Sequence, residues 1–273
     1  MDRAPVSVVI PAHNIESYVG DAIRSVLAQT LPVAEIIVVA DDCSDQTPQV
    51  AEDLGATVLR LERGNISAAR NLGIRASTQP WIAFLDADDF WEEDKIGFQW
   101  RAIKAWPSAA MISCDFFTVS NDKVTSPSER YLRERWNKLK TTAISGYCRY
   151  LEKIEGEFLS RVFLAVPTVM LRRDVFSGVG FFDENLIYGQ ALEFFARVLA
   201  QYPLAFVERP LVYQRVHASN HTRNVKGSWI SYISVVDQML KNPNLYPEGA
   251  GEAYRARLKR DFHHAERELA RNT

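Results

Sequence analysis

Short apolar runs alternate with amphipathic stretches through the first 120 residues of the chain. Apolar residues recur at three- and four-residue spacing from Ile15 to Leu27, which predicts a helix with one face on a sheet. Two more helices are predicted, one near 47–48 with Thr47 as its N-cap and one over 66–76. Buried strands are predicted at 6–10, 35–39, 57–61, 81–85 and about 110–119. This alternation is typical of an α/β protein with a mostly parallel central sheet flanked by helices.

The rest of the chain changes in texture twice. Residues 121–161 mix charged and aromatic side chains, which we interpret as an insertion of loop and helix over the active face. A strand at 166–171, a helix at about 189–200 and two short strands at 204–207 and 211–216 follow. The tail is predicted to be helical, and its basic amphipathic part at 254–271 packs on the protein or contacts a membrane surface. We expect one domain with halves at 1–120 and 121–227, and a C-terminal helical extension at 228–273.

Composition narrows the class of protein. The 273 residues, 47% of them hydrophobic, suffice for a large core. A formal net charge of −2 argues against nucleic acid as a partner, so any bound nucleotide is expected to be a small ligand. Three cysteines without metal-like spacing favour a reducing compartment, and no apolar run approaches the roughly 20 residues of a membrane span. We expect a cytoplasmic protein, possible peripheral membrane contact, and an oligomeric state that the sequence leaves open.

Three carboxylates follow the predicted strand at 81–85, and they are the most informative feature of the sequence. Asp86, Asp88 and Asp89 come where this apolar strand leaves the sheet. Like charges at this spacing repel one another, and a hard divalent cation that also binds phosphate oxygens would remove the repulsion. The alternative is a solvated acidic turn.

Two other strand ends carry polar groups to the same edge of the predicted sheet. The first strand ends in Pro11-Ala12-His13-Asn14, and the second is followed by Asp41. Ligand-binding groups in open α/β sheets gather at the carboxyl ends of the strands. The three strand ends therefore predict one ligand site.

These segments resemble the family 2 glycosyltransferases of the GT-A fold. The resemblance is close over about residues 7–91 and looser over 167–219. It is carried by Ser7-Val8-Val9-Ile10-Pro11-Ala12-His13-Asn14, Gln29-Thr30, Ile36-Ile37-Val38-Val39 with Asp41, Ser67-Ala68-Ala69-Arg70-Asn71-Leu72-Gly73, and Phe84-Leu85-Asp86-Ala87-Asp88-Asp89. Together these motifs are specific, whereas a bare Asp-x-Asp would be weak.

The resemblance implies a site for the base of a nucleotide, usually uridine. Pro11, Ala12 and His13 would line the base, Asn14 would shape the turn, and Asp41 would accept a hydrogen bond from the base N–H. Turn chemistry is the alternative for His13 and Asn14, and capping or solvation of a loop is the alternative for Asp41.

The resemblance also assigns the diphosphate end of the donor. Arg70 would lie near the nucleotide or brace Asp41 or Asp86, and Asp86 would reach the ribose or a metal-bound water. Asp88 would bind Mn²⁺ or Mg²⁺. His217, in Arg215-Val216-His217, would be a further metal or diphosphate contact, with an ordinary surface histidine as the alternative. Asp89 would support the metal ligands or cap the next segment. Asp89 and Asp115 are also candidates for the donor sugar or the acceptor.

One position departs from the family pattern. Inverting members carry a Glu-Asp pair at the start of the helix after the Gly-x-Phe-Asp segment, but here Gln190-Ala191 stands in its place, and neither side chain can act as a general base. Glu193 is the nearest substitute, although it could instead pair with Arg197 at the i,i+4 spacing. Asp183 is a second candidate, with the structural role that this position more often has in the family as the alternative.

The sequence favours a metal-dependent inverting glycosyltransferase of the hexosyl- or N-acetylhexosaminyl type. It would move a sugar from a nucleoside diphosphate, UDP first, to a hydroxyl group on a glycan or a lipid-linked sugar in glycan or polysaccharide biosynthesis. One sugar per encounter is expected, because the Gln-x-x-Arg-Trp segment and membrane spans of processive members are absent from the sequence. The main alternative is a nucleotide-sugar-binding protein without a general base. A nucleotidyltransferase is weaker, because the segment 11–20 lacks a Gly-rich phosphate loop.

Overall fold

The structure is a computed structural model of the whole chain. It describes residues 3–120, 123–125, 141, 143–152, 164–187, 189–217, 233, 236–237 and 252–271. The described strands are β1 (Ala4–Ala12), β2 (Val33–Asp41), β3 (Thr57–Leu61), β4 (Trp81–Phe84), β5 (Phe90–Trp91), β6 (Met111–Ser120), β7 (Lys123–Thr125), β8 (Ala143–Ser145), β9 (Cys148–Leu151), β10 (Met170–Arg172) and β11 (Leu204–Arg215). The described helices are α1 (Glu16–Leu27), α2 (Thr47–Asp53), α3 (Ile66–Ala76), α4 (Lys95–Ala105), α7 (Val175–Val179), α8 (Gln190–Gln201) and α10 (Glu252–Arg271), with a 3₁₀ turn η1 (Val166–Thr168).

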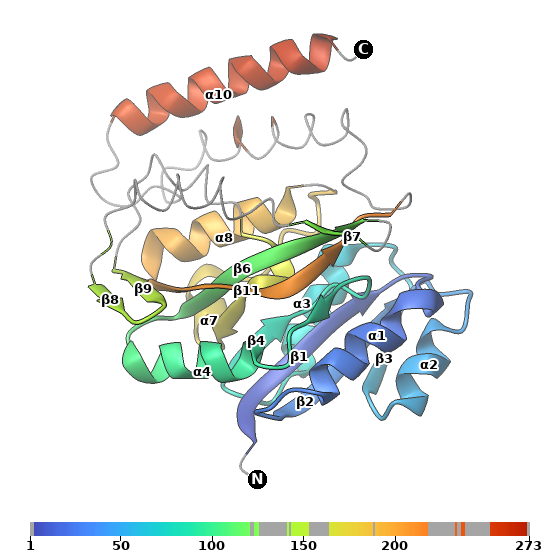
Figure 1. Cartoon of the computed structure of the whole chain (residues 1–273). Helices are drawn as coiled ribbons and strands as arrows, with labels where there is room; N and C mark the ends of the chain where they lie inside the picture. The colour runs from blue at the N-terminus through green and yellow to red at the C-terminus, as the bar shows by residue number, and fades with distance from the viewer. Residues whose placement is uncertain are drawn as a thin grey trace.

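All the described strands belong to one sheet, ordered β3-β2-β1-β4-β10-β6-β11-β9-β8, with β5 paired to β11 and β7 to β6 (Figure 1). The strands β3, β2, β1 and β4 are mutually parallel, as predicted for the first half of the chain. Beyond them the sheet is mixed, because β10 is antiparallel to both β4 and β6 while β11 runs parallel to β6. The α/β class is confirmed, and the ends of β4 and β11 are brought to the same region of the molecule.

Helices cover both faces of the sheet (Figure 1). Successive side chains of a strand point to opposite faces. On β1 and β2, Val9 and Val39 face α3, because both lie against Gly73 of that helix. The alternate residues Val8 and Val38 belong to the main core, which also contains the buried apolar side of α1. The pleat therefore sorts the apolar runs of the sequence into two packed layers.

Gly73 sets how closely α3 approaches the sheet. A Cβ at this position would overlap Cγ1 of Val9 and lie 3.3 Å from Cγ2 of Val39. Only a residue without a side chain lets the helix pack at this depth, which places Arg70 and Asn71 of α3 beside the strand ends.

Several details differ from the predictions. The two strands predicted at 204–207 and 211–216 form one strand, β11, with register shifts on either side of Pro210. Within 121–161 the described residues form strands β7, β8 and β9, so the expectation of loop and helix is wrong there, while 126–140 and 153–163 lie outside the described residues. Thr47 starts α2 instead of capping it, and its hydroxyl accepts the N–H of Ile15. The predicted strand at 166–171 is η1 followed by β10.

The predicted helix at the C-terminal end is present as α10, whose Phe262 packs against the main core. Within the described part of the chain, no helix has the length and apolar content needed to cross a membrane. The division into halves at residue 120 and an extension from 228 stays a prediction.

Helix α4, which the hydrophobic pattern did not single out, carries a fully buried lysine. Nζ of Lys95 donates to Oε1 of Gln99 at 2.8 Å and lies 3.9 Å above the ring of Trp91. Burial lowers the pKa of Lys95 to about 8, because the charged ammonium loses its hydration. The nearby thiol of Cys114 has a pKa raised by burial to about 12.

Gly73→Ala is expected to lower the free energy of unfolding by about 1–3 kcal/mol, because the new methyl group must displace Val9 or the helix. Urea unfolding measures this change. Gly97→Ala in α4 is the matched control, because its Cβ would meet only Oγ1 of Thr30 at an ordinary 3.7 Å. Equal effects of the two substitutions would contradict the close-packing argument.

Lys95 is expected to make the stability of the protein depend on alkaline pH. Its folded pKa of about 8 lies below the ordinary 10.5, so the unfolded chain binds more protons between these values and the free energy of unfolding rises with pH across this window. The rise is at most about 3 kcal/mol. The buried thiol of Cys114, whose pKa is raised, acts in the opposite sense above about pH 9, so the contribution of Lys95 is the difference between wild type and Lys95→Met. Urea unfolding at about pH 7 and about pH 9.5 should show the stability of wild type rising relative to that of Lys95→Met; an equal change with pH in both proteins would refute the assignment.

Candidate functional site

The acidic turn, residues Asp86 to Asp89, lies directly after β4, next to the end of β1. The N–H of Leu85 donates to the carbonyl of Val9, and the N–H of Asp89 closes the turn on the carbonyl of Asp86 at 3.0 Å. Parallel pairing of β1 with β2 and β4 brings the three polar strand ends to one edge of the sheet. The predicted gathering of these groups is therefore present.

Asp88 meets His217 across 129 residues of sequence: Oδ2 of Asp88 lies 3.0 Å from Nε2 of His217. Both side chains are mostly buried. The pKa of Asp88 is raised, first because burial penalises the carboxylate and next because Asp86 is close. A carboxylate oxygen and an imidazole nitrogen pointing at each other are two donor atoms that one cation can share.

Asp86 is paired with Arg70 of α3 at 2.8 Å. The side chain of Arg70 is only 3% exposed. Among the described residues, its Nε and Nη1 have no hydrogen-bond partner. The structure thus places Arg70 as a brace of Asp86, one of the alternatives, and leaves buried donors beside the acidic turn.

Asp89 faces the protein. It is 2% exposed, and its Oδ1 accepts the backbone N–H of Arg215 at 2.9 Å. Burial, together with the charges of Asp88 and Asp86, raises the pKa of Asp89 well above its usual range. Asp89 therefore ties the acidic turn to the end of β11, which fits its predicted place behind the metal ligands.

A divalent cation fits the chemistry of this corner, although the described residues contain no group of three or more His, Cys, Asp or Glu side chains arranged to hold one. Asp88 and His217 supply two ligand atoms 3.0 Å apart. Mg²⁺ and similar cations are commonly held by one or two protein ligands with the remaining positions filled by water and substrate phosphate. The two residues match that pattern.

The segment after β1 is held by the loop after β2. Pro11 and Ala12 are buried at the end of β1, and Nδ1 of His13 lies 2.7 Å from the carbonyl oxygen of Asp41. Asn14 adopts a left-handed conformation with φ of 45°, and its Oδ1 accepts the N–H of Ser44 at 2.8 Å. Asn14 therefore shapes the turn, and His13 is oriented at the mouth of the predicted base site.

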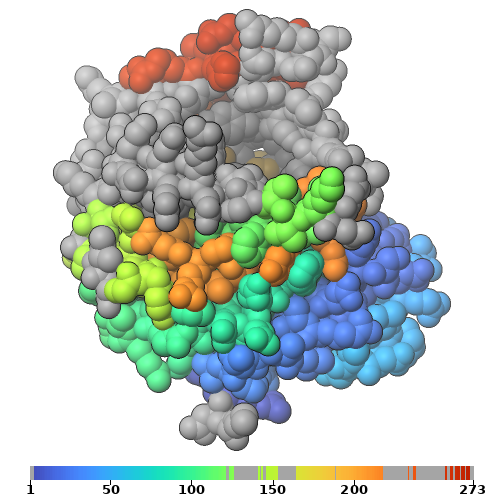
Figure 2. Space-filling view, viewed as in Figure 1, coloured from blue at the N-terminus to red at the C-terminus, as the bar shows by residue number. Residues whose placement is uncertain are grey.

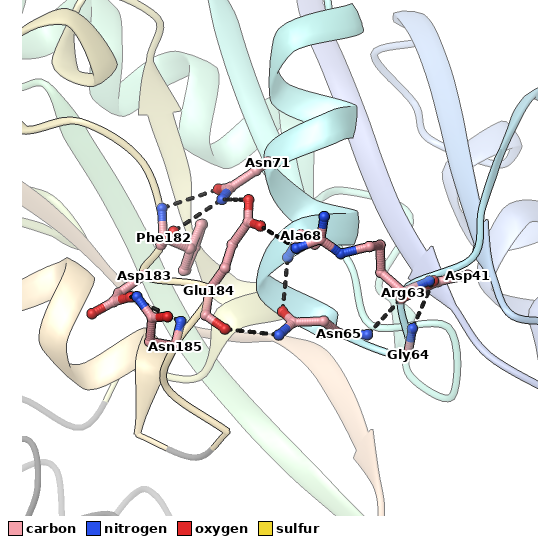
Figure 3. Close-up of polar contacts among 10 residues, drawn as sticks. All are labelled: Asp41, Arg63, Gly64, Asn65, Ala68, Asn71, Phe182, Asp183, Glu184 and Asn185. Atoms are coloured by element: carbon pink, nitrogen blue, oxygen red, sulfur yellow. Dashed lines mark hydrogen bonds and ion pairs between the residues drawn. The ribbon is translucent and has the colours of Figure 1, made fainter.

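The carboxylate of Asp41 organises the turn that leads into α3 (Figure 3). It accepts the backbone N–H groups of Arg63, Gly64 and Asn65 at 2.8, 3.0 and 2.6 Å. Asn65 in turn caps α3 by accepting the N–H of Ala68. A carboxylate offers about four acceptor directions, so this loop-capping role, the alternative given for Asp41, leaves room for one further donor.

The segment at 182–185 is fastened to α3 (Figure 3). The side chain of Asn71 accepts the N–H of Phe182 and donates to its carbonyl and to Oε1 of Glu184, at 3.0, 2.9 and 2.9 Å. Nδ2 of Asn65 donates to the carbonyl of Glu184 at 2.8 Å. Between these fixed points, Oδ1 of Asp183 accepts the backbone and side-chain N–H groups of Asn185.

Sequence reasoning gave no role to Asn65 or Glu184 and used Asn71 only as part of a motif. Partners 111 to 119 residues apart join these side chains to the segment at 182–184. The available signal was weak: an asparagine directly before a predicted helix is an N-cap candidate, which identifies Asn65 but not its second partner.

Glu193 forms a buried ion pair. Its two oxygens accept Nε and Nη2 of Arg197 at 2.6 and 2.8 Å, and Nη2 also donates to the carbonyl of Phe181. This is the pairing offered as the alternative for Glu193. Its carboxylate holds the arginine that fastens the turn before α8, while Gln190 opens that helix.

Asp115 is on β6, opposite Pro210 of β11, and is 9% exposed. Its Oδ1 accepts the N–H of Phe116. Strand β10 separates β6 from β4, so Asp115 is not on the strand that carries the acidic turn.

The chain is similar in sequence to glycosyltransferases of two bacteria. The chain is 27% identical over 243 residues to an uncharacterised glycosyltransferase of Rickettsia prowazekii, covering 86% of this chain and 71% of that protein. It is 28% identical over 192 residues to the uncharacterised glycosyltransferase EpsJ of Bacillus subtilis, of which it covers 53%.

Two solved structures share the architecture. The S. aureus TarS structure in complex with UDP-GlcNAc superposes with a TM-score of 0.68 at 16% identity, over 95% of this chain and 72% of that one. The mannosyltransferase PcManGT of Pyrobaculum calidifontis, in complex with GDP-Man and Mn²⁺, gives a TM-score of 0.65 at 16% identity, over 94% and 70%. Residues 7–177 match the family model described as "Glycosyl transferase family 2". This match covers more than half of the chain, which therefore belongs to glycosyl transferase family 2.

Proposed function

We propose that this chain transfers a sugar from a nucleoside diphosphate, with UDP as the nucleotide, to a hydroxyl group of a glycan or lipid-linked acceptor. The proposal includes inversion at the sugar C1 and dependence on Mn²⁺ or Mg²⁺. The observation that carries it is the meeting of Asp88 with His217 at 3.0 Å beside the Arg70–Asp86 pair. Distant segments are folded to put cation ligands and a buried guanidinium at one corner.

The choice of donor rests on the residues and on two neighbours. The TarS structure contains UDP-GlcNAc and that of PcManGT contains GDP-Man with Mn²⁺. In the described part of this chain the carboxylate of Asp41 accepts three backbone N–H groups and has the capacity for a fourth donor, which suits a single N–H such as that of a uracil ring. Asp86, which is on the same turn as Asp88 and is paired with Arg70, would reach the ribose.

The residues divide the work of donor cleavage. When bound, the cation would supply positive charge for the diphosphate that leaves the sugar. Asp88 and His217 would hold it, and the buried guanidinium of Arg70, whose Nε and Nη1 have no hydrogen-bond partner among the described residues, would direct positive charge toward the donor. Buried donors that are already oriented stabilise developing negative charge without reorganising during the reaction.

Inversion requires the acceptor oxygen to attack C1 from the face opposite the diphosphate, and a base must take its proton. We assign this role to Asp183 in preference to Glu193. Both oxygens of Glu193 accept N–H groups of Arg197 and its side chain is only 7% exposed, so its carboxylate is engaged inside the protein and is not presented to an acceptor. Asp183 is half-buried and uses Oδ1 for Asn185, so Oδ2 is the oxygen that would receive the proton.

A second candidate function is binding of a nucleotide sugar without transfer. It is favoured by Gln190-Ala191 and by the ion pair that engages Glu193. The two functions share the donor site and differ only in turnover.

Asp88→Ala is expected to abolish the metal dependence of UDP binding, weakening UDP affinity in Mn²⁺ by at least about 10-fold, because one of two cation ligands is lost. Calorimetric titration of UDP with and without Mn²⁺ measures it. The matched control is Asp53→Asn, which changes an exposed carboxylate on α2 that accepts a hydrogen bond from Gln49 and lies outside the acidic turn. If wild type binds no UDP, or binds it equally without metal, the metal-dependent donor site is wrong.

Asp183→Asn is expected to lower UDP release from UDP-sugars in the presence of a panel of hydroxyl acceptors by about 10²- to 10⁴-fold, with UDP affinity within about twofold of wild type. Glu193→Gln is expected to act on stability instead, lowering the free energy of unfolding by about 3 kcal/mol by breaking a buried pair. Wild-type binding without turnover of any donor would favour the binding protein, and a Glu193→Gln variant that is stable but inactive would return the base to Glu193.

A further inference from the structure

Among the described residues, His217 lies one position beyond the final backbone hydrogen bond between this segment and β6. That bond runs from the N–H of Val216 to the carbonyl of Val119 at 2.8 Å. The backbone pairing of β11 therefore ends one residue before the histidine. Among the described side chains, Asp88 contacts one nitrogen of its ring, and the ring of Tyr18 is stacked on its face at 5.2 Å between centroids with an interplanar angle of 16°.

Tyr18 belongs to a longer stack, in which it lies between the guanidinium of Arg215 and the imidazole of His217. Phe117 lies on Tyr213 at 4.9 Å, and Tyr213 lies on Phe90 at 4.6 Å. The guanidinium of Arg215 is 4.6 Å above the ring of Phe90 and 5.2 Å above that of Tyr18. We call these residues, with His217, the ring stack. The ring stack begins at the aromatic rings of β5, β6 and β11. It continues through the guanidinium of Arg215 and the ring of Tyr18 on α1, and it ends at the imidazole of His217.

Polar contacts of Arg215 with Asp89, Asp88 and Asp21 restrict its position within the ring stack. Its backbone N–H donates to Asp89, its Nη1 donates to the carbonyl of Asp88 at 3.3 Å, and its Nη2 pairs with Asp21 at 2.8 Å. Asp21 is three residues after Tyr18 on α1, so both lie on the same side of the helix. Figure 2 shows the end of β11 (orange) against the N-terminal elements (blue) at the surface.

We propose that Tyr18 is a positioning residue that holds the plane of the His217 imidazole, so that Nε2 points to the cation position beside Asp88. The proposal rests on the proposed function, because it concerns the same cation site. An imidazole turns about two torsions, and a ligand nitrogen must present its lone pair along one direction. A ring stacked on the face of the imidazole restricts both torsions while its Nε2 edge stays directed at Asp88.

The size of the effect follows from the strength of ring stacking. Parallel aromatic pairs contribute a modest free energy beyond their buried area, which corresponds to roughly 2- to 10-fold in affinity. Residues that orient a metal-ligating histidine have effects of this order or larger. Tyr18→Leu should thus weaken Mn²⁺ binding by about 2- to 10-fold, whereas Tyr18→Phe, which keeps the ring, should bind within twofold of wild type.

The experiment is titration of wild type, Tyr18→Leu, Tyr18→Phe and His217→Ala with Mn²⁺, alone and with UDP. Electron paramagnetic resonance follows free Mn²⁺, and pulsed measurements detect the nitrogen coupled to the bound ion. We expect nitrogen coupling in wild type and Tyr18→Phe, its absence in His217→Ala, and weaker coupling with lower affinity in Tyr18→Leu. This coupling is a signature that loss of stability alone would not move.

Ile23→Val is the control for packing on the same helix. Ile23 is fully buried in α1 and is not part of the ring stack. Its substitution is expected to lower the free energy of unfolding without changing a residue that contacts the imidazole. Equal losses of Mn²⁺ affinity in Ile23→Val and Tyr18→Leu would overturn the proposal, as would wild-type affinity in Tyr18→Leu. If His217→Ala binds Mn²⁺ like wild type, or wild type binds none, the cation site of the proposed function fails, and the positioning role fails with it.

Discussion

The structure depends on the placement of three carboxylates within four residues at the end of a buried strand. Each carboxylate has a partner that is distant in the sequence. Asp86 pairs with Arg70 of α3, whereas Asp88 contacts His217 and Asp89 accepts the backbone N–H of Arg215, both at or just after the end of β11. Without these partners, like charges in a largely buried turn would destabilise it. Helix α3 must pack closely and β11 must end at this corner for the partners to arrive.

Helix α3 connects the proposed donor site with the segment that carries the proposed base. Asp41 orders the turn before α3, and Asn65 and Asn71 extend from that helix to the segment carrying Asp183 (Figure 3). Hydrogen bonds in a connected network strengthen one another in a medium of low dielectric constant. The proposed base is therefore held by the helix whose first turn follows the loop bound by Asp41, the residue proposed to meet the nucleotide base.

Buried charge serves two separate purposes in this protein. The pair of Glu193 with Arg197 satisfies both partners and fastens the entry to α8, and Lys95 is accommodated by Gln99 and the face of Trp91. The buried guanidinium of Arg70, in contrast, keeps two donors without a partner in the described part of the chain. Satisfied charges are best explained as structural, whereas unsatisfied ones near an acidic turn are where a ligand would be stabilised.

Local patterns in the sequence determined the parallel first half of the sheet, the helix at 66–76 and the acidic turn, because strand and helix periodicity and the charge of neighbouring residues are properties of adjacent positions. The sequence left two interpretations open for each of two residues: Glu193 as a base or as the partner of Arg197, and Arg70 as a nucleotide contact or as a brace of an aspartate. Only the tertiary structure placed these side chains, seated His217 on Tyr18, and joined Asn71 to Glu184. Such contacts join residues from separate elements, and their geometry depends on how helices and strands pack, which no local pattern records.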